Sequence, residues 1–456
     1  MRLYNTLSGK IEEFRPISGK NVSLYTCGPT VYDSAHIGNL RTFVFEDILR
    51  RTLEFFGYGV KQVMNITDID DKTIARSEGK KAAFEKLTRD LETKFWSDLE
   101  KLNIKKPAET PKATEYVEKI VAFVKDLLDK DYAYKGVDGS IYFSIAKFVD
   151  YGKLSNLDKT GIKSGARVAQ DEYSKENPAD FVLWKAWDEK DGEIFWDPST
   201  WLGTGTELGK GRPGWHIECS AMSQDKLGET IDIHAGGVDL IFPHHENEIA
   251  QSEARTGKKF VNYWLHAEHL LVDGKKMSKS LGNFYTLDDI IEKGFDPLDF
   301  RYLCLSAHWR DKLNFTWDSL DGAKNALVRA RKIIANDSRP DRGSIDSEYI
   351  SRFKSAIEND LNTPKALAVF WNLLRDEEIS AGDKKATALE MDRVFELDLD
   401  KTTIDEIPAE VQKLVDERQD AREEKDFGHA DEVREQIEKL GYVVEDSGKE
   451  TKILRK

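Results

Sequence analysis

Residues 22–39 read VSLYTCGPTVYDSAHIGN, a short apolar strand followed by a glycine-proline turn. Beyond the turn, Leu40, Val44 and Ile48 recur at the spacing of an α-helix, so this stretch predicts strand, loop and helix in succession. A second apolar run at 60–66 ends in the acidic segment 67–72. This order predicts a parallel β-α-β unit of an α/β fold, a Rossmann-type doubly wound parallel sheet whose ligands bind at the strand ends.

The pattern changes in blocks along the rest of the chain. Helical spacing dominates residues 82–134, an irregular stretch rich in tryptophan follows, and strand and helix alternation then returns. Amphipathic helices predict a bundle. Near the end of the chain, one helix with an apolar stripe and two short hairpin strands at 442–444 and 452–454 predict a small α+β module, and the stripe consists of Ala430, Val433, Ile437 and Leu440. The expected divisions are a Rossmann first half at 1–134, an insertion at 135–214, a Rossmann second half at 215–270, a loop region rich in lysine at 271–320, an α-helical bundle at 321–400 and a C-terminal α+β module at 401–456.

Length and composition indicate a globular protein with several structural units. The chain has 456 residues, more than one hydrophobic core usually organises, with 39% hydrophobic and 33% charged residues. Its amino terminus carries no apolar run behind a basic start, so we expect no signal peptide or membrane span and a cytoplasmic location. The 3 cysteines, Cys27, Cys219 and Cys304, are odd in number and far apart, which argues against a disulfide framework.

The net charge of -15 does not indicate a polyanionic partner, because binding to phosphates needs a local positive field. Basic residues do cluster locally, at 50–51, at 275–279 and in the tail 449–456. A nucleic acid would contact such patches rather than the average surface.

The segment that ends in His36-Ile37-Gly38-Asn39 leads into the amino terminus of a predicted helix, where backbone N–H groups and the helix dipole favour phosphate. Gly38 allows close approach. His36 and Asn39, one helical turn apart, could both donate hydrogen bonds to phosphate oxygens as charge builds in a transition state. The alternative is a helix start with an incidental histidine, so this motif alone is a weak indicator of nucleotide binding.

Two lysines, Lys276 and Lys279, lie in the basic segment Lys276-Met277-Ser278-Lys279-Ser280. Because Gly274 and Gly282 loosen the chain on either side, the two ammonium groups could close over the β- and γ-phosphates of a triphosphate. They would then stabilise departing pyrophosphate. An exposed basic turn is the alternative, but in this order after the histidine loop the two motifs together are far more specific than either alone.

Four residues from distant segments could bind a metal ion: Cys27, Cys219, His244 and Glu248. His244 and Glu248 are four positions apart, so a helix would present both on one face. Cys27, at the end of the first strand, and Cys219 can supply two thiolates if the parallel sheet brings them together, and this donor set suits zinc. A buried cysteine is more often a small apolar filler, which is the alternative here and our interpretation of Cys304.

These motifs together resemble the cysteinyl-tRNA synthetases, a class I aminoacyl-tRNA synthetase family. The resemblance covers nearly the whole chain and rests on the stretches 25–32, 36–39, 67–72, 211–222, 242–248, 276–280 and 360–364. It implies a Rossmann catalytic domain with an inserted connective domain, a stem-contact region at 271–320, a helical bundle and an anticodon-binding module at 401–456.

The resemblance also implies an activity, that of a cysteine–tRNA ligase. Such an enzyme activates L-cysteine with ATP to cysteinyl-adenylate and pyrophosphate, then transfers the cysteine to the 3′-terminal ribose of tRNA(Cys). Zn²⁺, and Mg²⁺ bound with ATP, are the implied cofactors, and a monomer is expected. The zinc ligands that it implies are Cys27, Cys219, His244 and Glu248, and the residues around the substrate are Cys27, Thr67, Trp215 and His234. It places the nucleotide against His36, Gly38, Asn39, Gly236, Gly237, Asp239 and Lys279. The catalytic residues that it implies are His36, Asn39, Lys276 and Lys279.

Zinc has a physical rationale as the selecting group. Cysteine and serine differ only by sulfur for oxygen, a contrast that apolar packing discriminates by only about 10- to 200-fold. Zinc favours a thiolate and would leave a serine hydroxyl poorly accommodated, so no editing site would be needed. Asp70 and Asp71 receive no role beyond the start of a capped helix.

Three other functions fit parts of the sequence. A related ligase that joins cysteine to a small amino-sugar would not need the module at 401–456. A zinc peptidase is disfavoured because the helix motif around His245 lacks a second histidine. A non-catalytic relative is disfavoured because both phosphate motifs are intact. Two features depart from the family, a long glycine-rich link at 196–210 and an ending at 450–456 without the expected tryptophan.

Overall fold

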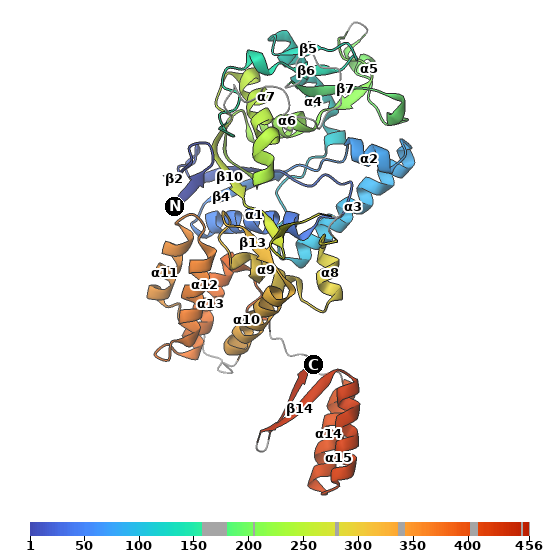
Figure 1. Cartoon of the computed structure of the whole chain (residues 1–456). Coiled ribbons are helices and arrows are strands. Elements are labelled where there is room, and N and C mark those ends of the chain that lie inside the picture. Colours follow the sequence, from blue (N-terminus) through green and yellow to red (C-terminus); the bar gives the residue numbers. More distant parts are fainter. Residues whose placement is uncertain are drawn as a thin grey trace. The chain divides into compact units, whose positions relative to one another are not determined.

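A computed structural model of the chain describes residues 1–156, 180–203, 206–278, 282–335, 343–401, 409–447 and 450–455 (Figure 1). The described elements confirm the predicted class, an α/β fold followed by helices and a small α+β module. Among these residues, no helix combines the length and the apolar character that a membrane span needs.

Four parallel strands form the central sheet, in the order β10-β9-β3-β4. They are β3 (Asn21–Thr26), β4 (Gly59–Met64), β9 (Ile231–Gly237) and β10 (Val261–Ala267). Their apolar side chains are buried on both faces, which explains why the strands read as nearly continuous apolar runs. Strand order reverses between β3 and β9, so the carboxyl ends of these two strands form the switch point at which such sheets bind ligands.

Helices cover both faces of this sheet. On one face, Phe45 and Leu49 of α1 (Ile37–Phe55) share a buried cluster with Leu24 of β3. On the other face, α6 (Trp215–Leu227) and α7 (Glu246–Thr256) pack through Ile217 and Ile249 in a cluster that contains Tyr25 of β3. Since Leu24 and Tyr25 are consecutive, the alternation of β3 sends one side chain to each layer.

The insertion differs from the irregular segment that the sequence predicted. Its described part is a four-stranded antiparallel sheet in the order β5-β6-β7-β8, made of β5 (Ala133–Lys135), β6 (Ile141–Phe143), β7 (Phe181–Ala186) and β8 (Gly211–Pro213). Strands of three to six residues are too short for an alternating pattern to be recognised, which explains the error. In the long link, α5 (Ser199–Leu202) forms, and the link residues 204 and 205 lie outside the described part of the chain.

The remaining elements of this half surround the sheet. They are β1 (Arg2–Asn5), β2 (Lys10–Glu13), α2 (Asp71–Arg76), α3 (Lys81–Lys101), α4 (Val117–Asp129), β11 (Leu270–Val272), β12 (Lys275–Lys276), α8 (Leu287–Glu292), α9 (Pro297–Leu305), β13 (Leu313–Phe315) and α10 (Trp317–Ala335). β11 pairs with β12 in antiparallel and with β13 in parallel orientation, which forms a small second sheet that carries Lys276.

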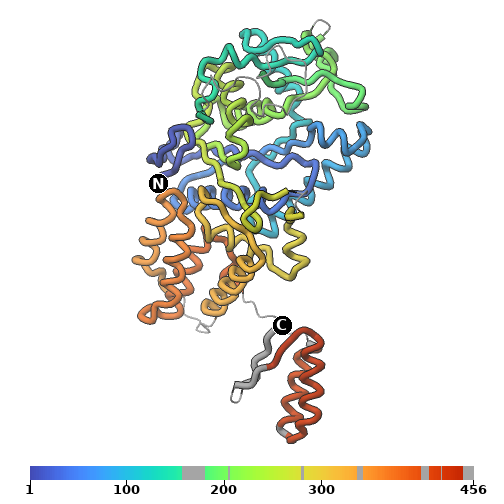
Figure 2. Tube along the Cα trace, in the orientation of Figure 1, coloured from blue at the N-terminus to red at the C-terminus, as the bar shows by residue number. Residues whose placement is uncertain are grey.

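The predicted helical bundle is present as α11 (Ser347–Ile357), α12 (Thr363–Arg375) and α13 (Ala381–Phe395). Asn362 caps α12, because its side-chain oxygen accepts a hydrogen bond from the Lys365 backbone N–H at 3.0 Å, and Pro364 lies in the first turn. Following the chain in Figure 2, the bundle and the insertion lie on opposite sides of the parallel sheet.

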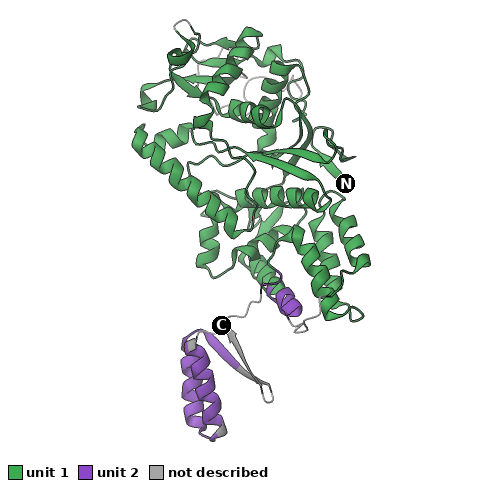
Figure 3. Ribbon diagram, turned by 180° about the vertical axis from the view of Figure 1, so that it is seen from behind, with its two compact units in different colours: residues 1–327, 339–398 green, residues 328–338, 399–456 purple. Residues whose placement is uncertain are grey.

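The chain divides into two compact units, residues 1–327 with 339–398, and residues 328–338 with 399–456 (Figure 3). In the second unit, α14 (Ala409–Glu423) and α15 (Phe427–Lys439) precede a hairpin of β14 (Tyr442–Ser447) and β15 (Glu450–Arg455). The hairpin and the buried stripe of Ala430, Val433 and Ile437 were predicted. Leu440 was wrongly placed in that stripe, because it lies just past the end of α15 and is 42% exposed.

Candidate functional site

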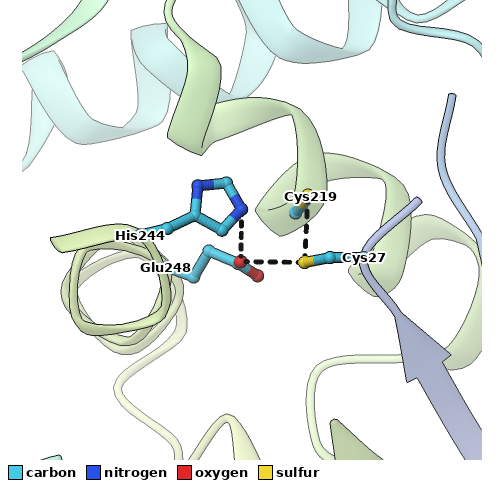
Figure 4. A group of neighbouring side chains, drawn as sticks. All are labelled: Cys27, Cys219, His244 and Glu248. Atoms are coloured by element: carbon cyan, nitrogen blue, oxygen red, sulfur yellow. Dashed lines mark hydrogen bonds and ion pairs between the residues drawn. The ribbon is translucent and has the colours of Figure 1, made fainter. Parts of the chain in front are cut away.

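Four side chains converge at the carboxyl end of β3. Cys27 directly follows β3, Cys219 lies in α6, His244 lies in the π-helical turn η6 (Ile241–His245), and Glu248 lies in α7. One ligand atom from each of the four lies within 4.8 Å of those of the other three, and all four residues are buried (Figure 4). The structure therefore brings together residues that the sequence spreads over several segments.

The spacing of the four side chains matches that of ligands around one ion. The two sulfur atoms, Cys27 Sγ and Cys219 Sγ, are 4.0 Å apart, and Glu248 Oε1 lies 3.9 Å from Cys27 Sγ and 3.0 Å from His244 Nε2. Two thiolates, an imidazole and a carboxylate form a donor set that a structural or catalytic zinc ion uses. A purely apolar filler role for Cys27 does not fit these polar contacts.

The charges of the cluster favour a bound cation. Burial opposes the charged form of Cys219, but contacts with Cys27 and His244 outweigh it and lower the pKa of this thiol to about 6. Burial likewise opposes ionisation of Glu248, and His234 and His244 overcome it, so the pKa of this carboxyl falls to about 2. Anionic groups held ionised in a buried pocket need a positive partner, which is protonated His244 in the ion-free protein and which a metal ion would replace.

We expect the metal affinity of this cluster to rise with pH between about pH 6 and about pH 10. Burial lowers the pKa of His244, but Glu248 and Cys219 outweigh burial and raise it to about 10 in the ion-free protein. A metal binds the neutral ring and the thiolate of Cys27, whose pKa burial raises well above its ordinary value. Binding must therefore release about two protons, and affinity should gain about 100-fold for each pH unit below these pKa values.

Competition for zinc against a coloured chelator at several pH values in this range would measure the effect. The variant His244→Ala serves as the control, because it should release about one proton fewer on binding. An affinity of the wild-type protein that stays constant across the range would contradict the prediction.

The residues assigned to the substrate lie against these four. His234 Nε2 is 3.0 Å from Glu248 Oε2, and the Trp215 ring lies 4.3 Å from the ring of His244, centroid to centroid. The hydroxyl of Thr67 donates to Glu218 Oε2 at 2.8 Å, and Glu218 precedes Cys219 in α6. All three predicted substrate residues thus line or adjoin one buried cluster.

The residues assigned to the nucleotide gather at the amino terminus of α1. His36 and Asn39 cap this helix reciprocally: His36 Nδ1 accepts from the Asn39 backbone N–H at 3.1 Å, and Asn39 Oδ1 accepts from the His36 backbone N–H at 3.2 Å. An accepting Nδ1 places the proton of a neutral ring on Nε2. The capping contacts use His36 Nδ1 and Asn39 Oδ1, and they do not use the donors His36 Nε2 and the Asn39 amide nitrogen.

The lysine-bearing segment adjoins the same helix terminus. A Cβ atom added to Gly38 would lie 3.4 Å from Met277 Cε, and the Ile37 backbone N–H donates to the Tyr285 carbonyl at 2.9 Å. Lys276 is exposed in β12, whereas Lys279 lies outside the described residues. The two phosphate motifs of the sequence are thus neighbours in space.

Gly236, Gly237 and Asp239 follow the carboxyl end of β9, the strand next to β3. A Cβ on Gly237 would come within 2.4 Å of Asp239 Oδ1 and within 3.7 Å of Thr42 Oγ1 in α1. A side chain at position 237 would therefore displace the Asp239 carboxylate, whereas its contact with α1 would be an ordinary one.

Sequence reasoning missed several polar residues of the site. Glu218 is fully buried, and burial raises the pKa of its carboxyl well above the ordinary value. His245 and His266 form a bonded pair, 2.7 Å between Nδ1 and Nε2. The run of two histidines at 244 and 245 was a usable signal for His245, but nothing local indicates the burial of Glu218.

Asp70 and Asp71, which the sequence assigned only to the start of a capped helix, make different contacts in the structure. Asp70 caps α2, because its Oδ1 accepts from the Lys72 backbone N–H at 2.8 Å. Asp71 forms ion pairs with Arg212 at 2.5 Å and Lys185 at 2.6 Å, two residues of the insertion. Burial opposes its charge, but these two cations lower the pKa of Asp71 to about 2. Asp71 therefore ties the Rossmann sheet to the insertion just before Trp215.

Comparison with known proteins identifies the family. The model described as tRNA synthetases class I (C) catalytic domain matches residues 13–325, and that described as Cysteinyl-tRNA ligase anticodon binding domain matches residues 405–453. A cysteine–tRNA ligase of Protochlamydia amoebophila is 46% identical over 473 residues, which cover 99% of this chain and 97% of the relative. The chain belongs to the cysteinyl-tRNA synthetase family.

Other relatives and solved structures agree with this assignment. A cysteine–tRNA ligase of Chlamydia felis is 47% identical over 464 residues, 98% of this synthetase and 96% of the relative. A Mycobacterium tuberculosis methionyl-tRNA synthetase in complex with methionyl-adenylate superposes with a TM-score of 0.57 at 13% identity, over 83% of this chain and 90% of that chain. A LeuRS-tRNA-LeuAMS complex of Agrobacterium radiobacter K84 gives 0.56 at 11% identity, over 84% of each chain. At these identities, the solved structures show the fold alone.

As a member of this family, the protein is an ATP-dependent aminoacyl-tRNA synthetase whose substrates are an amino acid, ATP and tRNA. Its buried cluster of two cysteines, a histidine and a glutamate has the composition and spacing to hold a metal ion.

Proposed function

We propose that this synthetase attaches L-cysteine to tRNA(Cys) and selects its amino acid through a zinc ion held by Cys27, Cys219, His244 and Glu248. The observation that carries the proposal is the convergence of these four buried side chains beside Trp215 and His234, at the switch point of the sheet. The phosphate-binding helix terminus begins from the same strand end.

A bound metal ion would let the enzyme distinguish cysteine from serine. An apolar pocket would favour cysteine over serine by only about 10- to 200-fold, because the two side chains differ by a single atom. When bound, zinc supplies a soft Lewis acid that prefers a thiolate to a hydroxyl. Thr67, Trp215 and His234 would then hold the rest of the amino acid, with Thr67 fixed by its hydrogen bond to Glu218.

In the first reaction step, the cysteine carboxylate attacks the α-phosphorus of ATP while the bond to pyrophosphate breaks. His36 Nε2 and the Asn39 amide nitrogen, which the capping of α1 does not use, would donate to the phosphates, and the positive end of this helix would stabilise their negative charge. Lys276 is exposed beside this terminus and, with Lys279, would neutralise the departing pyrophosphate. Mg²⁺ would accompany ATP at the β- and γ-phosphates.

In the second step, a hydroxyl of the terminal ribose of tRNA attacks the carbonyl carbon of the adenylate. The ester bond forms, AMP departs, and the hydroxyl proton passes to solvent. The carboxyl-terminal module would hold the anticodon, which explains why a family whose chemistry occurs in one unit carries a second unit.

The decisive assay is cysteine-dependent exchange of labelled pyrophosphate into ATP, run with native and zinc-stripped protein and with serine as a competitor. We expect exchange with cysteine alone and its loss after verified metal removal. Equal exchange with serine, or full exchange without metal, would rule out selection by zinc. A ligase for a small amino-sugar would show exchange but would not charge tRNA.

Removal of residues 399–456 is expected to spare pyrophosphate exchange and to weaken tRNA charging. A linked second binding module raises overall affinity by about 10²- to 10⁴-fold, so the KM for tRNA should rise by at least about 100-fold. Exchange uses only groups of the first unit, and its rate therefore controls for correct folding. Charging kinetics that stay unchanged in the shortened chain would show that the module does not bind tRNA.

A further inference from the structure

A second set of four potential ligands adjoins the first and shares two of its members. Cys27, His234, His245 and Glu248 each offer one ligand atom, all within 4.8 Å of one another, and all four residues are buried. Cys27 and Glu248 belong to both sets. Figure 4 shows the first set alone, in which Glu248 lies between His244 and Cys27.

The distances within the second set suit an ion as well as those within the first. Cys27 Sγ lies 3.3 Å from His245 Nε2, and His234 Nε2 lies 3.0 Å from Glu248 Oε2. The carboxylate of Glu248 presents Oε1 to His244 and Oε2 to His234, so its two oxygens face different sets.

His245 has the support that metal-binding histidines usually have. Its Nδ1 is bonded to His266 Nε2 at 2.7 Å, and His266 Nδ1 is bonded to the hydroxyl of Thr6 at 2.8 Å. This chain fixes the ring orientation and leaves Nε2 facing Cys27.

His234 is held from the other side. Its ring stacks on Trp264 at a centroid distance of 4.7 Å and lies 4.3 Å from the ring of His245. Among the described residues, its Nδ1 is a buried nitrogen without a hydrogen-bond partner. The two imidazoles are therefore placed side by side with their Nε2 atoms directed to the shared ligands.

We propose that Cys27, His234, His245 and Glu248 form a second metal site, called the second seat, for a zinc-like divalent ion. It is an alternative to the site of Cys27, Cys219, His244 and Glu248, called the first seat, because both use Cys27 and Glu248. One thiolate instead of two, and a ligand histidine without an outer partner, should make this seat about 10- to 100-fold weaker than the first. Loss of the first seat should therefore move an ion to the second seat rather than release it.

Cobalt(II) binding by the full chain tests the proposal, because charge-transfer absorption from sulfur to cobalt counts the bound thiolates. The double variant Cys219→Ala/His244→Ala, with folding checked by circular dichroism, should bind one cobalt ion with about half the wild-type charge-transfer absorption. Adding His245→Ala should remove this binding. His216→Ala is the matched control, because this buried histidine contacts His244 at 2.8 Å and belongs to neither set.

Two results would overturn the second seat. One is a folded double variant that binds no cobalt, and the other is cobalt binding that His245→Ala leaves unchanged. If the double variant does not fold, the same question is put to the single variants Cys219→Ala and His244→Ala. In each, His245→Ala should weaken cobalt binding at least tenfold, whereas in the wild-type background it should have little effect.

The second seat also has a consequence for catalysis, which rests on the proposed function. An ion there would engage His234, a residue assigned to the substrate pocket, so Cys219→Ala, in which the ion occupies the second seat, should keep a bound ion and show a raised KM for cysteine in pyrophosphate exchange. The cobalt measurements do not depend on activity. They would therefore stand even if Cys219→Ser left the exchange reaction intact and the proposed function failed.

Discussion

Replacement of Cys219 by serine is expected to weaken zinc binding by about 10- to 100-fold and to reduce kcat/KM for cysteine in pyrophosphate exchange by at least about 100-fold, because changes in outer partners of a metal already cost about 10- to 100-fold. The thiolate of Cys219 lies 4.0 Å from that of Cys27 in a pocket closed to solvent. A serine hydroxyl stays protonated and is a poor ligand for zinc. The KM for cysteine should change more than the KM for ATP, since the residues assigned to the nucleotide lie on α1 and β12.

Cys304→Ser provides a matched control for this experiment. Cys304 is equally a buried free thiol, but it lies in α9 away from the cluster, and burial raises its pKa to about 12. The control should retain its metal and its exchange activity. A zinc affinity of Cys219→Ser equal to that of the wild-type protein, measured by competition with a chelator, would contradict the assignment of this residue as a ligand.

Replacement of Asp47 by alanine is expected to destabilise the first unit by about 3–5 kcal/mol, because it leaves a buried guanidinium without its counter-charge. Asp47 Oδ2 accepts from Arg301 at 2.6 Å and from Arg51 at 2.7 Å, and Arg301 is fully buried. Asp47 Oδ1 accepts from the Lys105 backbone N–H at 2.9 Å. Burial opposes ionisation of this carboxyl, but Arg301 and Arg51 prevail and lower its pKa.

The Asp47 cluster joins α1 to the helical bundle. Arg301 Nε donates to the Phe395 carbonyl at 2.7 Å, and Arg51 pairs with Glu396, both at the end of α13. The same helix α1 begins with the residues that we propose bind the nucleotide. We therefore expect Asp47→Ala to lower exchange activity at temperatures where the wild-type protein remains folded.

The shift in the thermal unfolding midpoint would measure the effect of Asp47→Ala. Glu78→Ala is the control, because the Glu78–Lys80 pair is exposed on both sides and should contribute nothing measurable. Asp47→Asn tests charge alone, since it keeps the size and some hydrogen bonds of the side chain. A midpoint of Asp47→Ala equal to that of the control would refute the role of the buried pair.

Local chemistry was sufficient to predict much of this protein. The strand, turn and helix of residues 22–48 depend on apolar spacing and on a Gly-Pro turn, which neighbouring residues determine. The same holds for the bundle helices and the terminal hairpin. Prediction failed where elements are too short to show a period, as in the strands of the insertion, and at Leu440, where the helix ends first.

The sequence by itself determined which residues have the chemistry to bind phosphate and metal, because donor types and their local spacing are properties of the chain. Only the tertiary structure decided which of them meet. Cys27 and Cys219 are 192 positions apart and come together because β3 and α6 pack face to face. The pairing of Asp71 with Arg212, the burial of Glu218 and the placement of His245 against Cys27 also depend on this packing. Contacts between distant segments leave no periodic trace in the sequence, so long-range packing alone specifies them.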